Sequence, residues 1–526
     1  MAMRNDNMGQ SKILPLDISE LIPVDHICYL VIAIVNSIDV SDVEKKYRST
    51  AGNPAYSRRM LLRLVIMASI DAVWSSRKIA KQAHENVVYM YLTGDAKPDF
   101  RTISKFKKDC KELIEATFKK TVTTAKAAGI LNMTHLSTDG TKEKANASNS
   151  HSLSKEEIEE LRRILEQGIA IDKEEDKLYG DKRGDELPPE LNTQAKIREK
   201  IKEVEEASGK KMKNSAKTII EQHALGDDND KEVIIDKLDK AEEELNKSGQ
   251  GAVSITDPES RFMKNKKGKK ELSYNPQISV DSDSGIIAAN DVTQDCSDHY
   301  QLQPQVEMIE ENLGELPAGT KISSDNGYFT GPNLRYLEGK GLDGYIPDSK
   351  QAQKHKGKKV EDSPYSKDKF DYDEANDLFI CPNGDVLVRK GEYMANGKLQ
   401  YSYYGANCSE CPFQEECAGK GKRRKITSDD YEAERRRMAA KMQSEAGKEE
   451  YKKRKATVEW PFGNIKHNMK FREFLTRGIE NVRNEFNLVC TAHNMKVMWA
   501  KLCRNGSSLS EIVGLVPGQA ANVAAI

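Results

Sequence analysis

The chain has 526 residues, several times the roughly 100 to 200 of a typical domain, so we expect two or more domains with full hydrophobic cores. Charged residues make up 31% and hydrophobic residues 37%, against about 25% and about 45–50% in average proteins, which indicates much solvated helix or loop. The sequence has no apolar run of about 18 residues and no apolar N-terminal stretch, which argues against a membrane span and a secretory signal. We therefore expect a soluble, cytoplasmic protein without a membrane partner, whose cysteines stay reduced.

The net charge of −1 hides three segments of opposite sign. Residues 51–130 hold 15 Lys and Arg against 7 Asp and Glu, a local charge of +8, and residues 420–472 hold 17 against 8, a local +9. Residues 152–250 hold 19 against 27, a local −8. Basic regions of this size attract polyanions, of which nucleic acid is the common one, although a solvated lysine-rich helix gives the same count.

The first half of the chain is predicted to be mainly helical. Residues 1–130 have apolar residues at spacings of three and four, which favours an all-α N-terminal domain. At residues 131–151 the pattern changes, and NMTHLSTDG indicates a short strand that ends at Asp139. Residues 152–250 favour helix again and begin with the capping-box pair Ser154 and Glu157, so we expect a long, charged helical insertion such as an antiparallel hairpin.

The second half of the chain mixes strands and helices. Within residues 251–380, NPQISVDSDSGIIAANDVTQD predicts a hairpin, YQLQPQVEMIEENLG predicts a helix, and KISSD predicts a strand that ends at Asp325. Residues 381–425 contain a group of cysteines, residues 426–505 are predicted to be basic and helical, and residues 506–526 are interpreted as a flexible tail. The expected fold class is therefore α/β.

Three acidic residues are candidates for a metal site. Asp139 and Asp325 each end a predicted strand, and ligands bind at such strand ends in open α/β sheets, although most strand-end aspartates only begin a turn. Together with a carboxylate from a late basic helix they would form an oxygen-rich site for one or two Mg²⁺ ions. Glu459 is the candidate for that third ligand, and Lys466, two helical turns further on, would bind DNA phosphates.

At this point the sequence resembles a known family. The segments LSTDGTKEKANAS, SSDNGYFTGPNL and YKKRKATVEWPFGNIKH are similar to the three acidic blocks of the DDE transposases of bacterial insertion sequences, in the family's order. The part from LIPVDHICYL to FRTISKFKK resembles the helical InsH-like domain that precedes them. The resemblance implies a mixed-sheet catalytic core of the ribonuclease H-like type. In that core, Asp139, Asp325 and Glu459 would bind two Mg²⁺ or Mn²⁺ ions about 4 Å apart for phosphodiester cleavage and transfer.

The third block departs from the family's usual pattern. The family often has Tyr, two residues, Arg, three residues and then Glu, but here one extra residue separates Arg454 from Glu459, which puts the roles of Tyr451 and Arg454 in doubt. Pro461 follows Glu459 closely, and because proline is tolerated in a first helical turn, we expect Thr457 to cap a helix that has Glu459 in that first turn.

Further residues are candidates for DNA binding or for structural roles. Trp460 would stack on a flipped base at a transposon end, or else pack against the sheet. The expected DNA-binding residues are Arg77, Lys78, Arg454, Lys455, Trp460 and Lys466. The other carboxylates near the predicted strands are interpreted as structural: Asp257, Glu259, Asp281, Asp283 and Asp291.

Four of the nine cysteines lie within 37 residues: Cys381, Cys408, Cys411 and Cys417. A CxxC pair with two further thiols matches a closed tetrahedral Zn²⁺ site, and the alternative is a loop with four reduced thiols. We therefore expect a structural zinc ion in this segment.

These features predict a DNA transposase that binds the terminal inverted repeats of its element, cleaves there and joins the ends to target DNA. The alternatives are another ribonuclease H-like nuclease and a catalytically silent or repurposed DNA-binding protein descended from a transposase. Because two transposon ends must be joined at one target, we expect a homodimer or higher oligomer on double-stranded DNA, near the bacterial nucleoid. The acidic segment 152–250 would pack on a protein partner, or would be a solvated spacer.

Overall fold

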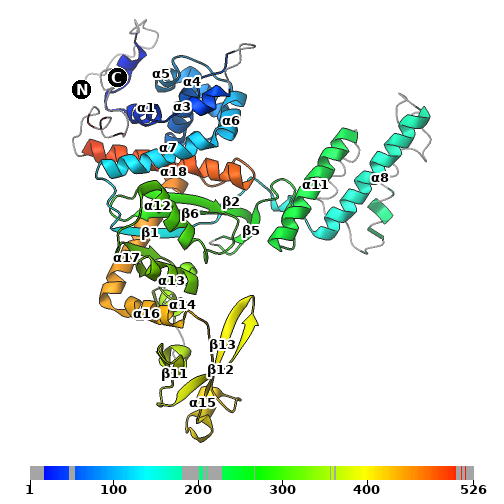
Figure 1. Ribbon diagram of the computed structural model, residues 1–526. Coiled ribbons are helices and arrows are strands. Elements are labelled where there is room, and N and C mark those ends of the chain that lie inside the picture. The colour runs from blue at the N-terminus through cyan, green and yellow to red at the C-terminus, as the bar shows by residue number, and fades with distance from the viewer. Residues whose placement is uncertain are drawn as a thin grey trace, which may run out of the picture.

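The computed structural model describes residues 17–46, 54–179, 228–265, 267–355, 357–359 and 363–504, with single positions at 199, 201–203, 205, 206, 209, 511, 514 and 516. Three parts are visible along the molecule: a helical region with a mixed sheet beneath it, a projecting pair of helices, and a second small sheet at the far end (Figure 1). Within the described residues, no helix is both long enough and apolar enough to cross a lipid bilayer.

The N-terminal region is all helical, as predicted. Its helices are α1 (Cys28–Asn36), α2 (Ser41–Lys45), α3 (Arg58–Ile70), α4 (Ser76–Glu85), α5 (Val87–Thr93), α6 (Phe100–Asp109) and α7 (Lys111–Ala127), after a short 3-10 turn at Ile18–Leu21. Asp99 caps α6, because its carboxylate accepts hydrogen bonds from the amides of Arg101 and Thr102. The helices share one hydrophobic core with the long C-terminal helix α18 (Ile479–Arg504), which lies beneath α7 in Figure 1.

The central sheet has three antiparallel strands followed by two parallel strands, in the order β7-β6-β1-β8-β9. Its strands are β1 (His135–Gly140), β6 (Lys270–Asp281), β7 (Ile287–Thr293), β8 (Lys321–Ser324) and β9 (Asp343–Tyr345), and the short strands β2 (Glu143–Lys144) and β5 (Arg261–Lys264) extend β6. The predicted hairpin is confirmed as β6 and β7. This mixed α/β architecture confirms the fold class expected from the sequence.

Helices cover the central sheet and set the direction of its strands. The helix α12 (Leu302–Leu313) connects β7 to β8, and α13 (Gly331–Gly339) connects β8 to β9, so that each parallel strand is reached through a crossover helix. The C-terminal helix α17 (Glu445–Gly463) crosses the sheet: its Glu450 pairs with Lys321 at the start of β8, and its Thr457 contacts Ser282 after β6.

The predicted helical insertion is confirmed as two helices, α8 (Lys155–Tyr179) and α11 (Asp228–Ser248), which project away from the body in Figure 1. The capping box forms as expected, because the Ser154 amide donates to the Glu157 carboxylate and the Glu157 amide donates to Ser154 Oγ. A separate small core joins the helices, and the ion pairs of Arg162 with Asp239 and Glu242 link their outer faces. The strands β3 (Ser152–Leu153) and β4 (Val253–Ser254) pair at their base.

The far end of the molecule is a five-stranded antiparallel sheet in chain order. Its strands are β10 (Asp371–Asp373), β11 (Leu378–Ile380), β12 (Val386–Ala395), β13 (Lys398–Gly405) and β14 (Lys425–Ser428), with the short helices α14 (Ser349–His355) and α15 (Gln414–Ala418) beside them. Aromatic rings, among them those of Phe370, Phe379 and Tyr403, form its core.

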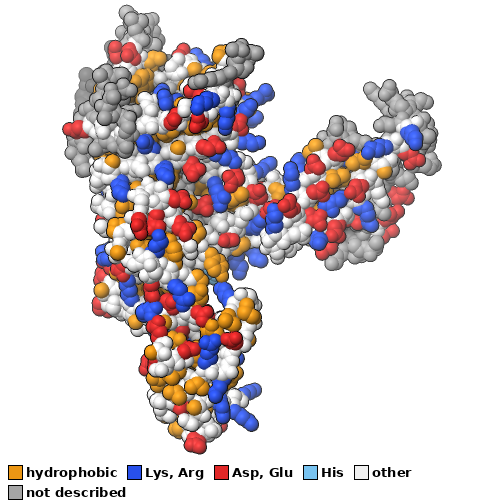
Figure 2. Space-filling view, viewed as in Figure 1, with side chains coloured by type: hydrophobic (Ala, Val, Ile, Leu, Met, Phe, Trp, Pro, Cys, Tyr) orange, Lys and Arg blue, Asp and Glu red, His pale blue; other side chains and the backbone are white. Residues whose placement is uncertain are grey.

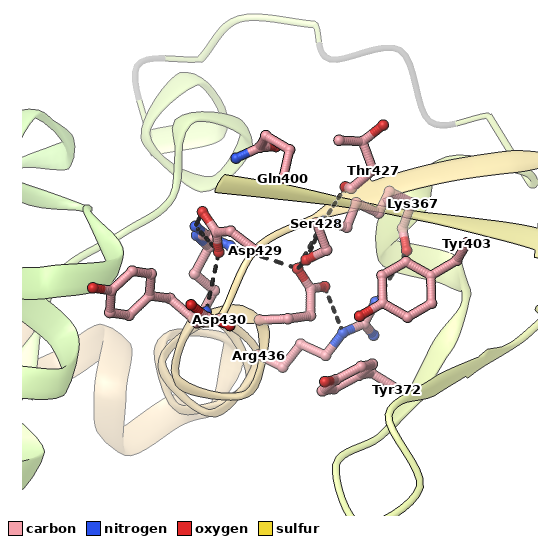
Figure 3. Close-up of polar contacts among 12 residues, drawn as sticks. Lys367, Tyr372, Gln400, Tyr403, Thr427, Ser428, Asp429, Asp430 and Arg436 are labelled. Carbon is pink, nitrogen blue, oxygen red and sulfur yellow. Dashed lines mark hydrogen bonds and ion pairs between the residues drawn. The ribbon is translucent and has the colours of Figure 1, made fainter. Parts of the chain in front are cut away.

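A buried polar network fixes this second sheet to helix α16 (Glu432–Gln443), as Figure 3 shows. Glu432 is only 5% exposed, and its carboxylate lies 2.7 Å from Lys367 Nζ and 2.9 Å from Arg436 Nε. The hydroxyl of Ser428, at the end of β14, donates to the same carboxylate at 2.6 Å. Because each buried charge has a partner, the joint between the sheet and α16 is specific.

Candidate active site

Two of the predicted acidic residues lie at the ends of neighbouring strands. Strands β1 and β8 run parallel, and their last paired residues are Thr138 and Ser324. Asp139 and Asp325 are therefore the next residues on two adjacent parallel strands, and both are partly buried. The Asp325 carboxylate also accepts a hydrogen bond from the Gly327 amide at 2.7 Å, which holds the turn after β8. The sequence predicted this pairing of strand ends.

Charged side chains of both signs surround the Asp139 carboxylate. The pKa of Asp139 is raised to about 6 in total: burial raises it most, the Arg454 guanidinium lowers it, and the carboxylates of Asp325 and Asp298 raise it by smaller amounts. The Arg454 Nη2 atom lies 3.0 Å from Asp139 Oδ1, with only 12% of the Arg454 side chain exposed. Arg454, which was expected to contact DNA, is thus the counter-ion of the acidic site.

The third expected ligand, Glu459, lies in α17 and is exposed. Within the described residues it forms no hydrogen bond or ion pair, and no three His, Cys, Asp or Glu side chains of those residues are arranged to hold a metal ion together. Glu459 lies eight residues after Tyr451, roughly 80° around the helix. Burial raises the pKa of Tyr451 most, and Asp325 and Asp139 add to this, so the Tyr451 side of α17 faces the two aspartates.

The expected helix start at Thr457 is wrong. Helix α17 begins at Glu445, capped by Ser444, so Glu459 and Pro461 lie near its C-terminal end. The Thr457 hydroxyl donates to the Lys453 carbonyl within the helix instead of capping it. Pro461 therefore lies inside the helix and cannot donate a backbone hydrogen bond to the Thr457 carbonyl. The regular helix ends two residues later, at Gly463, and a π-helical segment follows at Asn464–Asn468.

The remaining expected DNA-binding residues lie in different surroundings. Lys466 pairs with Glu143 at 2.8 Å and donates to the Thr141 hydroxyl, just beyond the end of β1. Trp460 is 50% exposed and packs edge-on against His493, with its ring over Gly285. Lys455 is exposed on α17. Trp460 is therefore available for stacking only on its open side.

Exposed basic side chains gather on the helical region. Helix α6 carries Arg101, Ser104, Lys105 and Lys108 on its exposed face, and Arg77 and Lys78 are exposed on the neighbouring α4. The Arg77 guanidinium stacks on the Phe100 ring at 5.1 Å. Figure 2 shows Lys and Arg side chains along this edge of the molecule.

A cavity of about 1070 Å³ runs between α6 and the start of α18, and Arg101, Lys105, Arg477 and Asn481 are among the residues that line it. The lining contains five basic side chains and two acidic ones, Asp109 and Glu485, and it comes from both the N-terminal helices and the segment before α18. The cavity therefore has an excess of positive charge across these two parts.

The four clustered cysteines lie together around one cavity of about 340 Å³ in the second sheet. Backbone amides donate to two of the sulfur atoms: Asp385 N to Cys381 Sγ at 3.3 Å and Arg424 N to Cys408 Sγ at 3.5 Å. Burial raises the pKa of the Cys417 thiol, and the other three thiols add to this. No disulfide joins these cysteines. The sequence predicted that the four cysteines form a cluster, but it did not predict that they lie in three loops of one sheet.

Comparison with protein families agrees with this geometry. A family model described as "Transposase DDE domain" matches residues 380–499, and one described as "Transposase domain (DUF772)" matches residues 16–109. The chain thus carries a C-terminal segment similar to a transposase DDE domain and an N-terminal segment similar to a second transposase domain. No curated protein and no solved structure matched in the corresponding searches. The resemblance of the N-terminal region and of the third acidic block, which contains Glu459, is thereby confirmed at the level of the family, whereas the blocks around Asp139 and Asp325 lie outside both matches.

One acidic residue beside the two strand ends was not singled out from the sequence. Asp298 lies in the loop between β7 and α12, and its Oδ1 atom accepts hydrogen bonds from Lys142, Asn275 and Gln277. The segment around it, DCSDHY, has no periodicity and is typical of a turn. Its position beside the two strand ends follows only from the three-dimensional arrangement of the strands.

Proposed function

We propose that this protein is a DNA transposase that binds the ends of a mobile DNA element, cleaves phosphodiester bonds there and joins the 3′ ends to target DNA. The observation that carries this proposal is the position of Asp139 and Asp325 at the ends of adjacent parallel strands in a chain with a transposase DDE domain. DDE transposases typically use divalent metal ions, and carboxylate oxygens are the ligands that Mg²⁺ and Mn²⁺ prefer.

The donor set fits such an ion. Asp139 is partly buried, its pKa is raised to about 6, and a second carboxylate lies at the end of the next strand, so the site carries negative charge that a cation would stabilise. Asp139 and Asp325 would hold the ions, and Glu459, which is exposed on another face of α17, would have to turn toward them to complete the set. The bound ions would activate the attacking oxygen and stabilise the leaving oxygen. Arg454 holds the Asp139 carboxylate in place, and Tyr451 closes the site on its apolar side.

The exposed basic surface of α4 and α6 supports binding of double-stranded DNA. Arg77, Lys78, Arg101, Lys105 and Lys108 present positive charge without burial, so they can neutralise phosphates. Lys455 is exposed on α17 and can add positive charge, Lys466 lies in the π-helical segment after α17 and is paired with Glu143, and Trp460 offers an aromatic surface. A DNA duplex bound along α6 and a scissile strand at Asp139 are the two contacts that transposition requires.

The four cysteines are proposed to bind one structural zinc ion. Cys381, Cys408, Cys411 and Cys417 line one cavity, and backbone amides donate to the sulfur atoms of Cys381 and Cys408. No three of these thiols converge in the metal-free arrangement, so the loops would close on the ion when it binds. The role of zinc would be to fix the loops of the second sheet, which α16 then links to the catalytic helix α17.

Assembly of two copies on DNA is part of the proposal. Helices α8 and α11 are proposed as the protein-facing part, because they project from the body and close a small core of their own. The net negative charge of this segment disfavours contact with DNA.

The test separates DNA binding from chemistry. Asp139→Ala, Asp325→Ala and Glu459→Ala are expected to abolish cleavage of a duplex that carries the element's terminal repeat, while each variant still shifts that duplex in a gel. The control is Asp371→Ala, an exposed residue of the second sheet, which should cleave like the unaltered protein. Undiminished cleavage by the Asp139 or Asp325 variant would overturn the assignment of that residue.

A further inference from the structure

Asp298 lies between the ends of the two strands that carry Asp139 and Asp325. A Cβ atom added to Gly140 would lie 2.8 Å from Asp298 Oδ1, and one added to Gly327 would lie 3.6 Å from Asp298 Oδ2. Gly140 directly follows Asp139, and Gly327 is the residue whose amide binds Asp325. The lack of side chains at these two glycines therefore lets the Asp298 carboxylate approach both strand ends.

The two oxygens of Asp298 have different surroundings. Oδ1 accepts hydrogen bonds from Asn275 Nδ2 at 2.7 Å, Gln277 Nε2 at 2.9 Å and Lys142 Nζ at 3.1 Å. Oδ2 accepts none from the residues that the structure describes, and the side chain is 21% exposed. One oxygen is thus anchored, and the other remains free next to the end of β8.

A second unpartnered oxygen lies at the same place. Asn275 is fully buried, and its Oδ1 atom has no hydrogen-bond partner among the described residues. That atom would lie 3.0 Å from a Cβ atom on Gly140. A buried acceptor without a donor is costly, so its presence here indicates a missing electropositive ligand. Asn275 Oδ1 and Asp298 Oδ2 are both hard oxygen ligands of the kind that Mg²⁺ and Mn²⁺ bind.

The orientation of Asp298 is fixed by a buried chain of side chains. The Tyr328 hydroxyl, in a fully buried ring, donates to Gln277 Oε1, and Gln277 Nε2 donates to Asp298 Oδ1. Tyr328 belongs to the turn after Asp325, and Gln277 lies opposite Gly140 in the sheet register. The chain links Asp298 to both strand ends without using its second oxygen.

We propose that Asp298 is a fourth acidic residue of the active site: no three carboxylates of the described residues converge on one point in the metal-free arrangement, and a divalent cation would draw the free oxygen of Asp298 together with Asp139 and Asp325. Gln277 and Tyr328 are positioning residues for it. The inference rests on the proposed function, because it assigns a further ligand to the same site. The alternative is that Asp298 binds no cation and has only a structural role in the loop before α12. There its backbone carbonyl accepts a hydrogen bond from the Gln301 amide.

The experiment measures Mn²⁺ binding by electron paramagnetic resonance of the free ion, on full-length protein, beside end cleavage. Asp298→Asn keeps the size of the side chain but removes its charge, and it should weaken Mn²⁺ binding about tenfold or more. The matched control is Asp295→Asn, in the same loop and exposed, whose Mn²⁺ affinity should stay within about twofold of the unaltered protein. Unchanged Mn²⁺ affinity in folded Asp298→Asn would overturn the inference.

A second variant covers the case in which Asp298→Asn folds poorly. Asp298→Cys places a softer ligand at the same position, so cleavage should fall in Mg²⁺ and recover at least in part in Mn²⁺. Equal loss in both metals would mean that Asp298 does not touch the ion. Asp139→Asn distinguishes a failure of the proposed active site from a failure of the role of Asp298. If both Asp139→Asn and Asp298→Asn leave Mn²⁺ binding intact, the proposed active site is wrong. If Asp139→Asn abolishes Mn²⁺ binding and Asp298→Asn does not, only the role of Asp298 is wrong.

Discussion

Replacing Asp139 by asparagine should stabilise the metal-free protein, although it should also abolish its chemistry. Burial raises the pKa of Asp139 from 3.8 to about 6 in the folded chain. Above pH 6 the folded state therefore contains an ionised carboxylate that the unfolded chain solvates more easily. The folded and unfolded pKa values differ by roughly two, and each pKa unit corresponds to about 1.4 kcal/mol in the free energy of unfolding. The ionised carboxylate therefore lowers that free energy by about 3 kcal/mol. The opposing effect of Arg454 is already contained in that pKa.

The sign of the effect fixes its dependence on pH. Because the folded pKa lies above the unfolded one, stability is lost as the pH rises from about 4 to about 6, and the full penalty remains at higher pH. Urea unfolding in EDTA, followed by tryptophan fluorescence, should show Asp139→Asn more stable by up to about 3 kcal/mol at pH 7.5, with little difference at pH 4. Asp371→Asn, at an exposed position, should show neither change.

Mg²⁺ should reverse the order, because only the unaltered protein keeps the full set of carboxylates. A variant Asp139→Asn that is less stable than the unaltered protein at pH 7.5 in EDTA would refute the reasoning. In that case the ion pair with Arg454 would contribute more than burial costs.

Three further predictions concern zinc, DNA and assembly. Protein purified without chelators should contain about one zinc ion per chain, and Cys411→Ser should lose it and lower the melting temperature, whereas Cys296→Ser should do neither; protein without zinc would leave the thiols as a reduced loop. The affinity for end DNA should fall steeply with salt, and Lys105→Ala should reduce the logarithmic salt slope by about 0.9, while Lys240→Ala on α11 should not; a flat salt dependence would contradict phosphate binding. Replacing residues 152–250 by a short Gly/Ser bridge should remove the paired-end complex in light scattering, and an unchanged mass would exclude this segment as the assembly surface.

Local sequence patterns predicted the strand ends well. Asp139 and Asp325 each follow a short buried strand and precede a glycine or an Asn-Gly turn, and both signals are contained within a few residues. The hairpin β6–β7 and the capping box at Ser154 are local in the same sense. Patterns of this kind need no knowledge of the rest of the fold.

Features that depend on distant residues could not be predicted in this way. Asp298 enters the site because Asn275 and Gln277, on β6, and Lys142, after β1, hold it there, and none of these contacts has a local signature. The start of α17 was misjudged because Pro461 suggests a first turn, whereas the helix begins sixteen residues earlier, at Glu445, and is stabilised by packing on the sheet. The second sheet, whose short strands are separated by cysteine-containing loops, was also not visible as strands in the sequence.

The most direct test of transposition is the product of strand transfer. The protein is incubated in Mg²⁺ with a duplex that ends in the element's terminal repeat and with a supercoiled plasmid, and junctions between the two DNAs are sequenced. The account predicts that the 3′ end of the repeat becomes joined to the plasmid, that EDTA or Asp325→Asn removes this product, and that the Asp325 variant still binds the repeat. Cleavage that never yields joined ends would identify a nuclease, and joined ends formed equally by Asp325→Asn would contradict the site described above.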